Sequence, residues 1–347
     1  MTMTDTKDCV LVTGGTGFLG VHCILQLLQN GYTVKTTVRS LKRQEAVIDM
    51  LKNGGITAFN KLSFIEADLL KNDNWAAAAT DCSYVLHVAS PISLNVPNDE
   101  NDMIKPAVEG TLRVLGAARD AGVKRVVMTS NFGAVGYSHT DTTKIITEES
   151  WTDPNEQGLS AYNKSKVLAE RAAWDFIERE GGELELSVVN PVGIFGPSLS
   201  PDLSSGFELL KRVLDGSMKR VPNMTLSIVD VRDVADLHIR AMTSPVAKGQ
   251  RFLAIAGDVM TLPEIALLMK TKLGDRLKTI STKRMPDWVV RGAALFSPTA
   301  RNVVPLLGRY RTASNEKAKK LLGWQPRSNE EALLATADSL IKFGAVK

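Results

Sequence analysis

The stretch Val10-Leu11-Val12-Thr13-Gly14-Gly15-Thr16-Gly17-Phe18-Leu19-Gly20 decides the fold of this chain. An apolar run of strand character leads into the glycines, and residues 21–29 have the pattern of a helix. A strand, a glycine-rich turn and a helix in this order are typical of a dinucleotide site, although such a turn can also occur without a ligand. Gly14 permits the turn, Gly17 lets the backbone approach a pyrophosphate, and Gly20 lets the helix lie close to the strand. The N–H groups at the start of the helix would then face the anion.

The rest of the chain alternates strand and helix patterns up to Pro191. This alternation predicts an α/β fold with a doubly wound parallel, or Rossmann, sheet. We expect a dinucleotide-binding Rossmann domain over residues 1–191 and a smaller, mixed substrate-binding part over residues 192–347, partly interleaved with the sheet through a strand near 251–256. The other expected strands are 32–38, 62–66, 84–88, 125–129 and 184–190, and the expected helices are 41–51, 75–79, 103–121, 161–180, 207–214, 262–273, 315–322 and 330–343.

The composition is that of an ordinary soluble protein, with 44% hydrophobic and 23% charged residues and a formal net charge of +4 over 347 residues. Because charges of both signs are interspersed, we expect no nucleic-acid partner and no membrane-surface partner. There is no run of about 18 apolar residues, and residues 1–8 are polar, so we expect neither a membrane-spanning helix nor a signal peptide. Three scattered cysteines, Cys9, Cys23 and Cys82, fit buried free thiols in a cytoplasmic protein. The four histidines show no metal-ligand spacing, so we expect no metal.

The end of the second expected strand indicates which dinucleotide binds. An NAD-specific site places Asp or Glu there, about 20 residues past the glycines, to hold the ribose 2′-hydroxyl. Here Arg39 occupies that position, Lys42 and Arg43 follow, and no acid is available. Since a guanidinium can bind a 2′-phosphate through two parallel hydrogen bonds, the sequence predicts NADP(H). The alternative is a solvated helix start, although cations are slightly unfavourable there. Asp68, after the third strand, is a candidate acceptor for the adenine amino group or a helix N-cap.

Tyr162 and Lys166 are the candidate proton-transfer pair. They stand four residues apart at the start of an expected helix, so both lie on one face of that helix. The alternative interpretation of this spacing is an exposed helical pair without function. Reducing a carbonyl requires a proton at oxygen, and a free tyrosine, with a pKa of about 10, is a weak acid–base group near neutrality. An ammonium about 4 Å away at an effective dielectric constant of about 20 favours the phenolate by about 4 kcal/mol. Lys166 is therefore expected to bring the pKa of Tyr162 toward neutrality and to bond the nicotinamide ribose.

Together these residues resemble the extended short-chain dehydrogenase/reductases. The closer match is the branch of dihydroflavonol reductases, cinnamoyl-CoA reductases and fungal methylglyoxal or ketone reductases, and it covers nearly the whole chain. The resemblance implies an NADPH-dependent carbonyl reductase, in which an aldehyde or ketone is the small-molecule substrate and an alcohol is the product. The matching stretches are 13–20, 37–39, 87–91, 105–110, 126–130, 162–166, 190–192, 195–197 and 230–234.

The resemblance also implies which residues meet the cofactor. It places Ser90, Pro91, Pro191 and Val192 near the nicotinamide half. The whole set of expected cofactor residues is Gly14, Thr16, Gly17, Phe18, Leu19, Gly20, Arg39, Lys42, Arg43, Asp68, Leu69, Ala89, Ser90, Tyr162, Lys166, Pro191 and Val192.

One departure from the family concerns its catalytic serine. The family usually has Thr-Ser-Ser after the fifth strand, and the catalytic serine is generally the second of the two; this chain has Thr129-Ser130-Asn131. Adjacent strand residues point to opposite faces, so Ser130 and Asn131 can both face the substrate only if the chain turns between them. Ser130 is slightly favoured as the catalytic residue because its hydroxyl matches the chemistry. Asn131 is the competing occupant, because its amide can donate a hydrogen bond to the substrate oxygen.

Other functions share parts of this pattern. A nucleotide-sugar epimerase or dehydratase has the same glycine and Tyr–Lys motifs but retains NAD, which Arg39 disfavours. A hydroxysteroid dehydrogenase would differ in substrate only. A regulator that senses NADPH without turnover often lacks the Tyr–Lys pair, which this chain keeps. The substrate pocket is expected from segments 92–102, 132–140 and 193–224, and the protein is expected to be a monomer or a homodimer.

Overall fold

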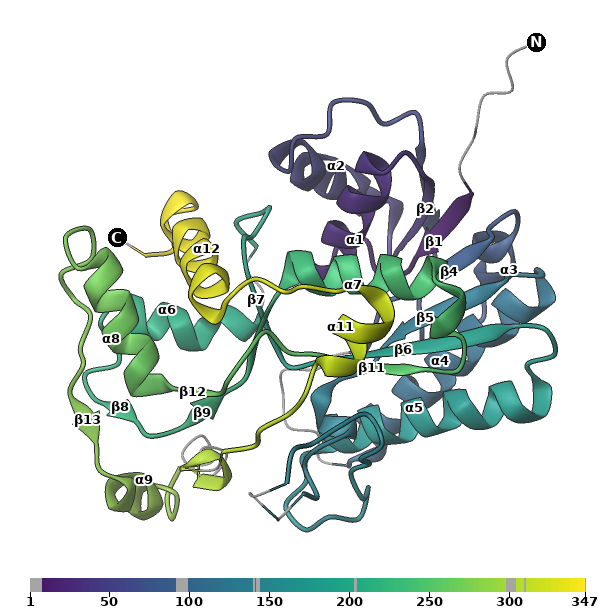
Figure 1. Cartoon of the computed structure of the whole chain (residues 1–347). Coiled ribbons are helices and arrows are strands. Elements are labelled where there is room, and N and C mark those ends of the chain that lie inside the picture. Colours follow the sequence, from purple (N-terminus) through teal and green to yellow (C-terminus); the bar gives the residue numbers. More distant parts are fainter. Residues whose placement is uncertain are drawn as a thin grey trace.

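At the centre of the molecule lies a parallel sheet of seven strands with helices on both faces (Figure 1). The computed structural model describes residues 8–91, 99–139, 141, 144–202, 205–297, 304–308 and 310–346. The strand order is β11-β6-β5-β4-β1-β2-β3, so the chain winds outward from β1 to β3, returns to β4 on the other side of β1 and winds outward again. This order confirms the predicted doubly wound Rossmann fold. The strands are β1 (Cys9–Val12), β2 (Thr33–Val38), β3 (Leu62–Glu66), β4 (Tyr84–His87), β5 (Arg125–Thr129), β6 (Glu185–Pro191) and β11 (Arg251–Ala254).

Burial explains why the central strands appear in the sequence as apolar runs. Helices cover both faces of the sheet, so a central strand has no face in contact with solvent. Its residues therefore do not need to alternate between apolar and polar. Every residue of β4 is buried, whereas β3, at the edge, is partly exposed along its length. Since all the strands are parallel, their carboxyl ends lie at one edge, which is where ligands bind in such folds.

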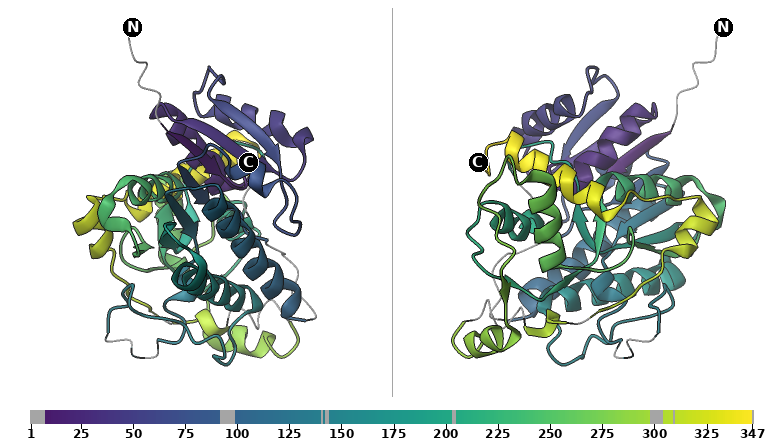
Figure 2. Two further views of the ribbon diagram at one scale, coloured as in Figure 1. Left: turned by 90° about the vertical axis from the view of Figure 1, so that its right-hand side faces the viewer. Right: turned by 60° about the vertical axis from the view of Figure 1, so that its left-hand side comes forward.

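Two layers of helices enclose the sheet, as Figure 2 shows from two further sides. One layer shares a single apolar core and consists of α1 (Phe18–Gln29), α2 (Gln44–Asn53), α7 (Val231–Thr243) and α11 (Glu316–Leu322). The opposite layer consists of α3 (Trp75–Ala79), α4 (Asn101–Asp120) and α5 (Ala161–Glu180). The long helices α4 and α5 pack against each other, and α5 carries the Tyr–Lys pair.

Helix α7 was not among the elements expected from the sequence, although it packs directly on α1. Its buried face includes Val231, Val234 and Leu237, which recur every three residues. It begins after Asp230, whose carboxylate caps the helix by accepting a hydrogen bond from the Arg232 N–H at 2.8 Å. The sequence signal was therefore present, namely an acidic N-cap before apolar residues at helical spacing, but the intervening charged residues obscured it.

The second half of the chain contributes both to the main sheet and to a smaller apolar core. β11 pairs with β6, while α6 (Glu208–Leu214), α8 (Leu262–Leu273) and α12 (Asn329–Lys342) share the smaller core beside the sheet (Figure 1). Short strands pair as β10 (Ile228–Asp230) with β7 (Gly193–Phe195), β12 (Met260–Thr261) with β9 (Thr225–Leu226), and β13 (Arg284–Met285) with β8 (Val221–Pro222). Within the described ranges the other helical segments are α9 (Asp287–Ala293) and the 3-10 turns η1 (Leu41–Arg43), η2 (Phe132–Ala134), η3 (Ser205–Phe207), η4 (Pro245–Ala247) and η5 (Val304–Leu306).

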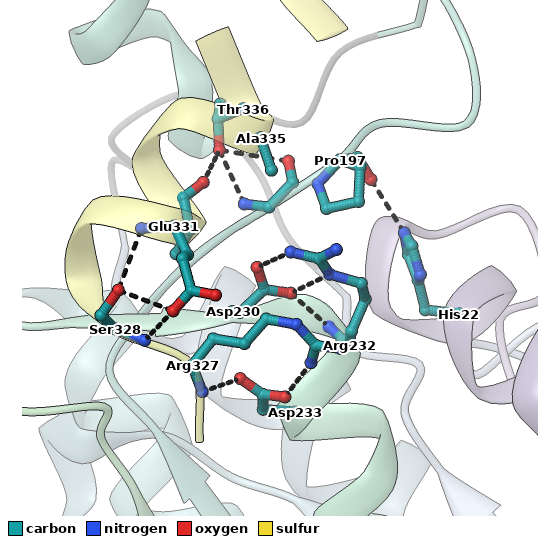
Figure 3. Close-up of polar contacts among 12 residues, drawn as sticks. His22, Pro197, Asp230, Arg232, Asp233, Arg327, Ser328, Glu331, Ala335 and Thr336 are labelled. Atoms are coloured by element: carbon teal, nitrogen blue, oxygen red, sulfur yellow. Dashed lines mark hydrogen bonds and ion pairs between the residues drawn. The ribbon is translucent and has the colours of Figure 1, made fainter. Parts of the chain in front are cut away.

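A polar cluster ties the two halves together (Figure 3). His22 of α1 reaches the carbonyl oxygen of Pro197 through Nε2 at 2.9 Å. Burial lowers the pKa of His22 to about 4, so the ring is neutral near pH 7 and this nitrogen donates. Asp233 of α7 accepts hydrogen bonds from the side chain and the backbone N–H of Arg327, just before α12. The start of α1, which follows the glycine turn, is thus held by residues of the carboxyl-terminal half.

Candidate active site

The expected cofactor residues share one position in the fold, because each of them follows the carboxyl end of a strand or lies at the start of α1 or α5. Parallel strands end at the same edge of the sheet, so the structure brings these residues together there. Along the chain they are Gly14, Thr16, Gly17, Phe18, Leu19 and Gly20 after β1, Arg39, Lys42 and Arg43 after β2, Asp68 and Leu69 after β3, Ala89 and Ser90 after β4, and Pro191 and Val192 at the end of β6.

The glycine-rich turn between β1 and α1 fits a pyrophosphate. Gly14 lies in the left-handed region with φ +76°, and a Cβ there would lie 3.0 Å from the Cβ of Ala89. A Cβ on Gly20 would lie 2.3 Å from the carbonyl oxygen of Gly14. Gly17 precedes α1 without a side-chain cap, and the first turn of α1 has no acidic residue. The backbone N–H groups and the positive end of the helix dipole are therefore available to an anion.

Two threonines that were not predicted as site residues hold this turn in place. The Thr37 hydroxyl accepts a hydrogen bond from the Gly14 N–H at 3.0 Å. The Thr13 hydroxyl accepts one from the Ala89 N–H at 2.9 Å and lies 3.1 Å from Nδ1 of His87. Burial lowers the pKa of His87 to about 3, so this ring stays neutral. Thr13 adjoins the glycines and could have been singled out, whereas the Thr37 contact spans 23 positions of sequence.

The three cations expected at the 2′-phosphate stand where β2 ends. Arg39 follows β2, and Lys42 and Arg43 belong to η1. All three side chains are exposed, and none of them forms an ion pair with another part of the described chain. Glu66, the last residue of β3, accepts a hydrogen bond from the Leu41 N–H at 3.0 Å and so borders the same turn. The cations outnumber this acid, which fits a phosphate ligand.

Three other expected cofactor residues have structural contacts of their own. Oδ1 of Asp68 accepts a hydrogen bond from the Leu70 N–H at 3.0 Å, so Asp68 forms a local turn, and the helix N-cap considered from the sequence is wrong because α3 begins at Trp75. Leu69 is buried. The ring of Phe18 packs edge-to-face on Phe207 with 4.9 Å between centroids, which joins the start of α1 to the smaller core.

Tyr162 and Lys166 lie in the first turns of α5, which Ser160 caps by accepting a hydrogen bond from the Asn163 N–H at 3.3 Å. Lys166 is buried, and burial lowers the pKa of its amine to about 8, while the charge of Glu170 opposes this shift. Burial raises the pKa of the Tyr162 phenol, so the expected net shift of that pKa toward neutrality is wrong for this structure. Helical spacing places two side chains on one face but does not fix the distance between their polar atoms or their burial.

Asn131 is the residue at the end of β5 that contacts Tyr162. Its Nδ2 donates to Oδ1 of Asn163 at 3.3 Å, and its Oδ1 accepts a hydrogen bond from the Ala134 N–H at 3.1 Å. The Asn131 side chain also interacts with the phenol of Tyr162 and lowers its pKa against the effect of burial. A Cβ on Gly133 would lie 2.2 Å from Oδ1 of Asn163, so this glycine makes room for the two amides.

Ser130 has a different environment. Its side chain is buried, and within the described ranges its hydroxyl has no hydrogen-bond partner. The backbone at Asn131 is extended, with φ −155° and ψ 168°, and the turn η2 begins only at the next residue. The Ser130 N–H donates to the carbonyl oxygen of Val189 at 2.9 Å, as in a continuing strand, so strand alternation directs the two side chains to opposite faces.

A buried ionic cluster lies behind Lys166 and was not foreseen from the sequence. Glu170, one helical turn further along α5, accepts hydrogen bonds from Nε of Arg251 at 2.6 Å and from Nδ2 of Asn190 at 2.8 Å. Asn190 also donates to the carbonyl oxygen of Asn131 at 3.3 Å. The cluster thus connects the proton-transfer helix with β6, β11 and the segment that carries Asn131. The spacing of Lys166 and Glu170 was visible in the sequence, but Arg251 lies 81 positions beyond Glu170.

Some expectations fall partly outside the described residues. Of the segments expected to line the substrate pocket, residues 92–98, 140, 203 and 204 are not described. Among the aromatic residues of these segments, Phe132, Phe195 and Phe207 are buried in apolar clusters. The described part of the chain contains no helix long and apolar enough to cross a membrane. It also contains no group of three or more His, Cys, Asp or Glu residues that could hold a metal ion.

Comparison with known proteins shows which proteins the whole chain resembles. The family model described as the 3-beta hydroxysteroid dehydrogenase/isomerase family matches residues 11–259. Cinnamoyl-CoA reductase 1 of Arabidopsis thaliana is 36% identical over 275 residues, which cover 76% of this chain and 77% of the relative. An anthocyanidin reductase of Vitis vinifera is 34% identical over 281 residues, which cover 77% and 81%. The crystal structure of yeast methylglyoxal/isovaleraldehyde reductase Gre2 complexed with NADPH matches with a TM-score of 0.79 and 28% identity, over 97% of this chain and 99% of that chain.

Proposed function

Because the chain belongs to the 3-beta hydroxysteroid dehydrogenase/isomerase family, among the extended short-chain dehydrogenase/reductases, we propose specific roles for the residues at the carboxyl edge of its sheet. The protein is an NADPH-dependent oxidoreductase that reduces an aldehyde or ketone to an alcohol. The observation that carries the proposed roles is the position of Tyr162 and Lys166, at the start of the helix that follows β5, on a sheet whose carboxyl edge also bears the glycine turn.

Tyr162 is the proposed proton donor. When bound, NADPH supplies the hydride that reduces the carbonyl carbon. The Tyr162 hydroxyl gives its proton to the carbonyl oxygen, and the positive charge of Lys166 stabilises the phenolate that remains. Two features support this direction of transfer. Burial favours the neutral phenol, which is the form that can donate, and a Lys166 pKa of about 8 leaves most of the amine charged near neutral pH.

We assign the second hydrogen bond to the carbonyl oxygen to Asn131 rather than to Ser130. The support is the contact between the Asn131 amide and Tyr162, together with the bond from Asn131 to Asn163 that fixes the orientation of the amide. A donor beside the proton-donating hydroxyl can stabilise the charge that develops on the substrate oxygen. Among the described residues the Ser130 hydroxyl has no comparable contact, and the extended backbone directs its side chain elsewhere.

The cofactor site is proposed along the carboxyl ends of β1, β2, β3, β4 and β6. The glycine turn and the start of α1 bind the pyrophosphate, and Arg39, with Lys42 and Arg43, binds the 2′-phosphate. Asp68 and Leu69 lie beside the adenine, and Ala89, Ser90, Pro191 and Val192 lie beside the nicotinamide. In this proposal residues 1–191 form the cofactor-binding domain and residues 192–347 supply most of the substrate-binding surface.

The alternatives differ from this proposal in testable ways. An epimerase or dehydratase would retain NAD, and Arg39 stands where an NAD site has an acid. A hydroxysteroid dehydrogenase would share every residue role and differ in substrate only. A non-catalytic NADPH sensor would bind the cofactor without turnover.

We also propose a cytoplasmic location, supported by the three free thiols, and a monomeric or homodimeric protein.

Loss of NADPH absorbance tests the proposal against a panel of aldehydes, diketones, β-keto esters, aromatic ketones and 3-ketosteroids. We expect turnover with members of the panel and, for Tyr162→Phe, loss of turnover with unchanged NADPH binding. Preserved turnover in Tyr162→Phe would remove the assignment of the proton donor. Binding of NADPH without turnover of any compound would favour the sensor.

A further inference from the structure

We propose that Cys9 and Cys82 form a thiol pair that small-molecule disulfides oxidise to an internal disulfide, at the end of β1 opposite the glycine turn. Cys9 is the first residue of β1, whereas the glycines follow the last residue of that strand. Cys82 lies just before β4, the strand that pairs with β1. The pair therefore belongs to no part of the carbonyl-reducing site.

The backbone brings the two thiols together. The Ser83 N–H donates to the carbonyl oxygen of Cys9 at 2.9 Å, which extends the β1–β4 pairing to the position of the cysteines. The Sγ atoms of Cys9 and Cys82 lie 3.4 Å apart, although the residues are 73 positions apart in sequence. Two sulfur atoms in contact need only a small side-chain movement to reach bonding distance.

The surroundings favour a reactive thiolate on Cys9. The hydrogen bond from Cys82 lowers the pKa of Cys9 to about 7, and the charge of Lys35 acts in the same direction. Burial and the carboxylate of Asp81 oppose the shift. Lys35 is held nearby because its amine donates to the carbonyl oxygen of Thr80 at 2.7 Å. Cys9 is also partly exposed, which differs from the buried thiol expected from the sequence, so a small disulfide can reach it.

The reaction balances with a small disulfide as the oxidant. The Cys9 thiolate attacks one sulfur of the disulfide, a mixed disulfide forms, and one small thiolate leaves. Cys82 then loses its proton to solvent, its sulfur attacks Sγ of Cys9, and the second small thiolate leaves. Two protein thiols are oxidised to one disulfide, and the small disulfide is reduced to two thiols. An added dithiol reverses both steps.

Cys23 provides an internal control. It is buried in α1, and burial raises the pKa of its thiol, so it should stay a thiol under conditions that oxidise Cys9. We expect Cys9 to react at least about 10-fold faster than Cys23, because only Cys9 has an appreciable thiolate fraction near pH 7 and access to solvent.

The test uses the folded full-length chain, reduced, freed of reductant and incubated with oxidised glutathione at pH 7.5, followed by acid quenching and peptide mass mapping. We expect the wild-type chain and Cys23→Ser to give a Cys9–Cys82 crosslink that dithiothreitol removes. Cys82→Ser should accumulate a glutathione adduct on Cys9, because the resolving thiol is gone. Cys9→Ser should leave Cys82 as a thiol.

A lasting glutathione adduct on Cys9 of the wild-type chain would overturn the proposal, and so would an unmodified Cys9. The crosslink also predicts a physical change that a surface adduct would not produce. Because the disulfide closes a long loop, oxidation should raise the thermal midpoint of unfolding of the wild-type chain, by about 5 °C or more. Treated Cys82→Ser should show no such rise.

Discussion

Glu170 and Arg251 form a buried ion pair directly behind Lys166, with 2.6 Å between Oε1 and Nε and side-chain exposures of 0% and 8%. The guanidinium of Arg251 also lies over the ring of Trp151, 3.8 Å from its centroid. The pair joins α5, which carries the proton-transfer residues, to β11, which comes from the second half of the sequence. Neither charge is solvated, so each depends on the other for its stability in the fold.

Replacing Arg251 by Met should therefore destabilise the protein strongly. The change leaves the Glu170 carboxylate buried without its ionic partner, and breaking such a pair costs about 3–5 kcal/mol of the free energy of unfolding. Urea unfolding followed by circular dichroism measures the loss. The matched control is Arg276→Met, because Arg276 pairs with Asp338 at 3.0 Å on the surface, with both side chains more than half exposed. That change should cost less than about 1 kcal/mol, and equal losses in the two variants would contradict this account.

Glu170→Gln should change the pH dependence of the reaction. Burial lowers the pKa of Lys166 to about 8 from its ordinary value of 10.5, and the Glu170 charge raises it. As the pH rises through about 8 the amine loses its charge, so kcat/KM for NADPH should fall on the alkaline side. Removing the Glu170 charge lowers the Lys166 pKa further, and the fall should begin at lower pH.

The control for this shift is Glu178→Gln, which removes an acidic charge from an exposed position of the same helix. Its alkaline limb should coincide with that of the wild-type enzyme. A Glu170→Gln profile that is lower at every pH but unshifted would mean that Glu170 acts through stability alone.

Asn131→Ala should lower kcat by about 100-fold, the effect typical of losing one hydrogen-bond donor at a developing oxyanion. The dissociation constant for NADPH should change little, because the proposed contact is with the substrate oxygen and Tyr162. Asn131→Ser should recover part of the activity, since a hydroxyl can also donate. Single-turnover reduction with saturating NADPH measures the step directly.

The comparison with Ser130→Ala decides between the two neighbours. Ser130 is buried without a hydrogen-bond partner among the described residues, so its replacement should change kcat by less than about 3-fold. A large loss in Ser130→Ala together with a small one in Asn131→Ala would transfer the role to the serine.

The fold was predictable because its signals are local. Helix α5 spans the expected residues 161–180, and its start is marked by the N-cap Ser160. Helix α8 likewise spans the expected 262–273, where Thr261 and Glu264 form a capping box. The site was predictable only in part. Sequence spacing is enough to place Tyr162 and Lys166 on one helix face. The pKa of Tyr162 and the partner of Glu170 depend on burial and on contacts between distant segments, which no local pattern contains.

Gly20→Ala should weaken NADPH binding and destabilise the fold. The added Cβ would lie 2.3 Å from the carbonyl oxygen of Gly14, so the helix must move away from the turn that binds the pyrophosphate. We expect the dissociation constant for NADPH to rise by at least about 10-fold and the free energy of unfolding to fall by about 1–3 kcal/mol. The matched control is Gly116→Ala in the second half of α4, where a Cβ would meet no described atom within 4 Å. That variant should bind NADPH normally and be as stable as the wild-type protein or more so, because Ala favours a helix over Gly.

Arg39→Ala should weaken the binding of NADPH and leave the binding of NADH nearly unchanged. Arg39 is exposed at the end of β2, and in the proposed site its guanidinium meets the 2′-phosphate that NADPH has and NADH lacks. Losing charge-assisted hydrogen bonds worth about 1.5–3 kcal/mol should raise the dissociation constant for NADPH by about 10- to 100-fold. Binding of NADH should change little, so titration of each cofactor by fluorescence gives the ratio directly. Lys52→Ala is the matched control, because Lys52 is an exposed cation of α2 whose charge is paired with Asp49 at 2.9 Å. It should leave both constants unchanged, and an Arg39→Ala variant that weakens NADH as much as NADPH would show that Arg39 acts on the fold of the turn instead of on the phosphate.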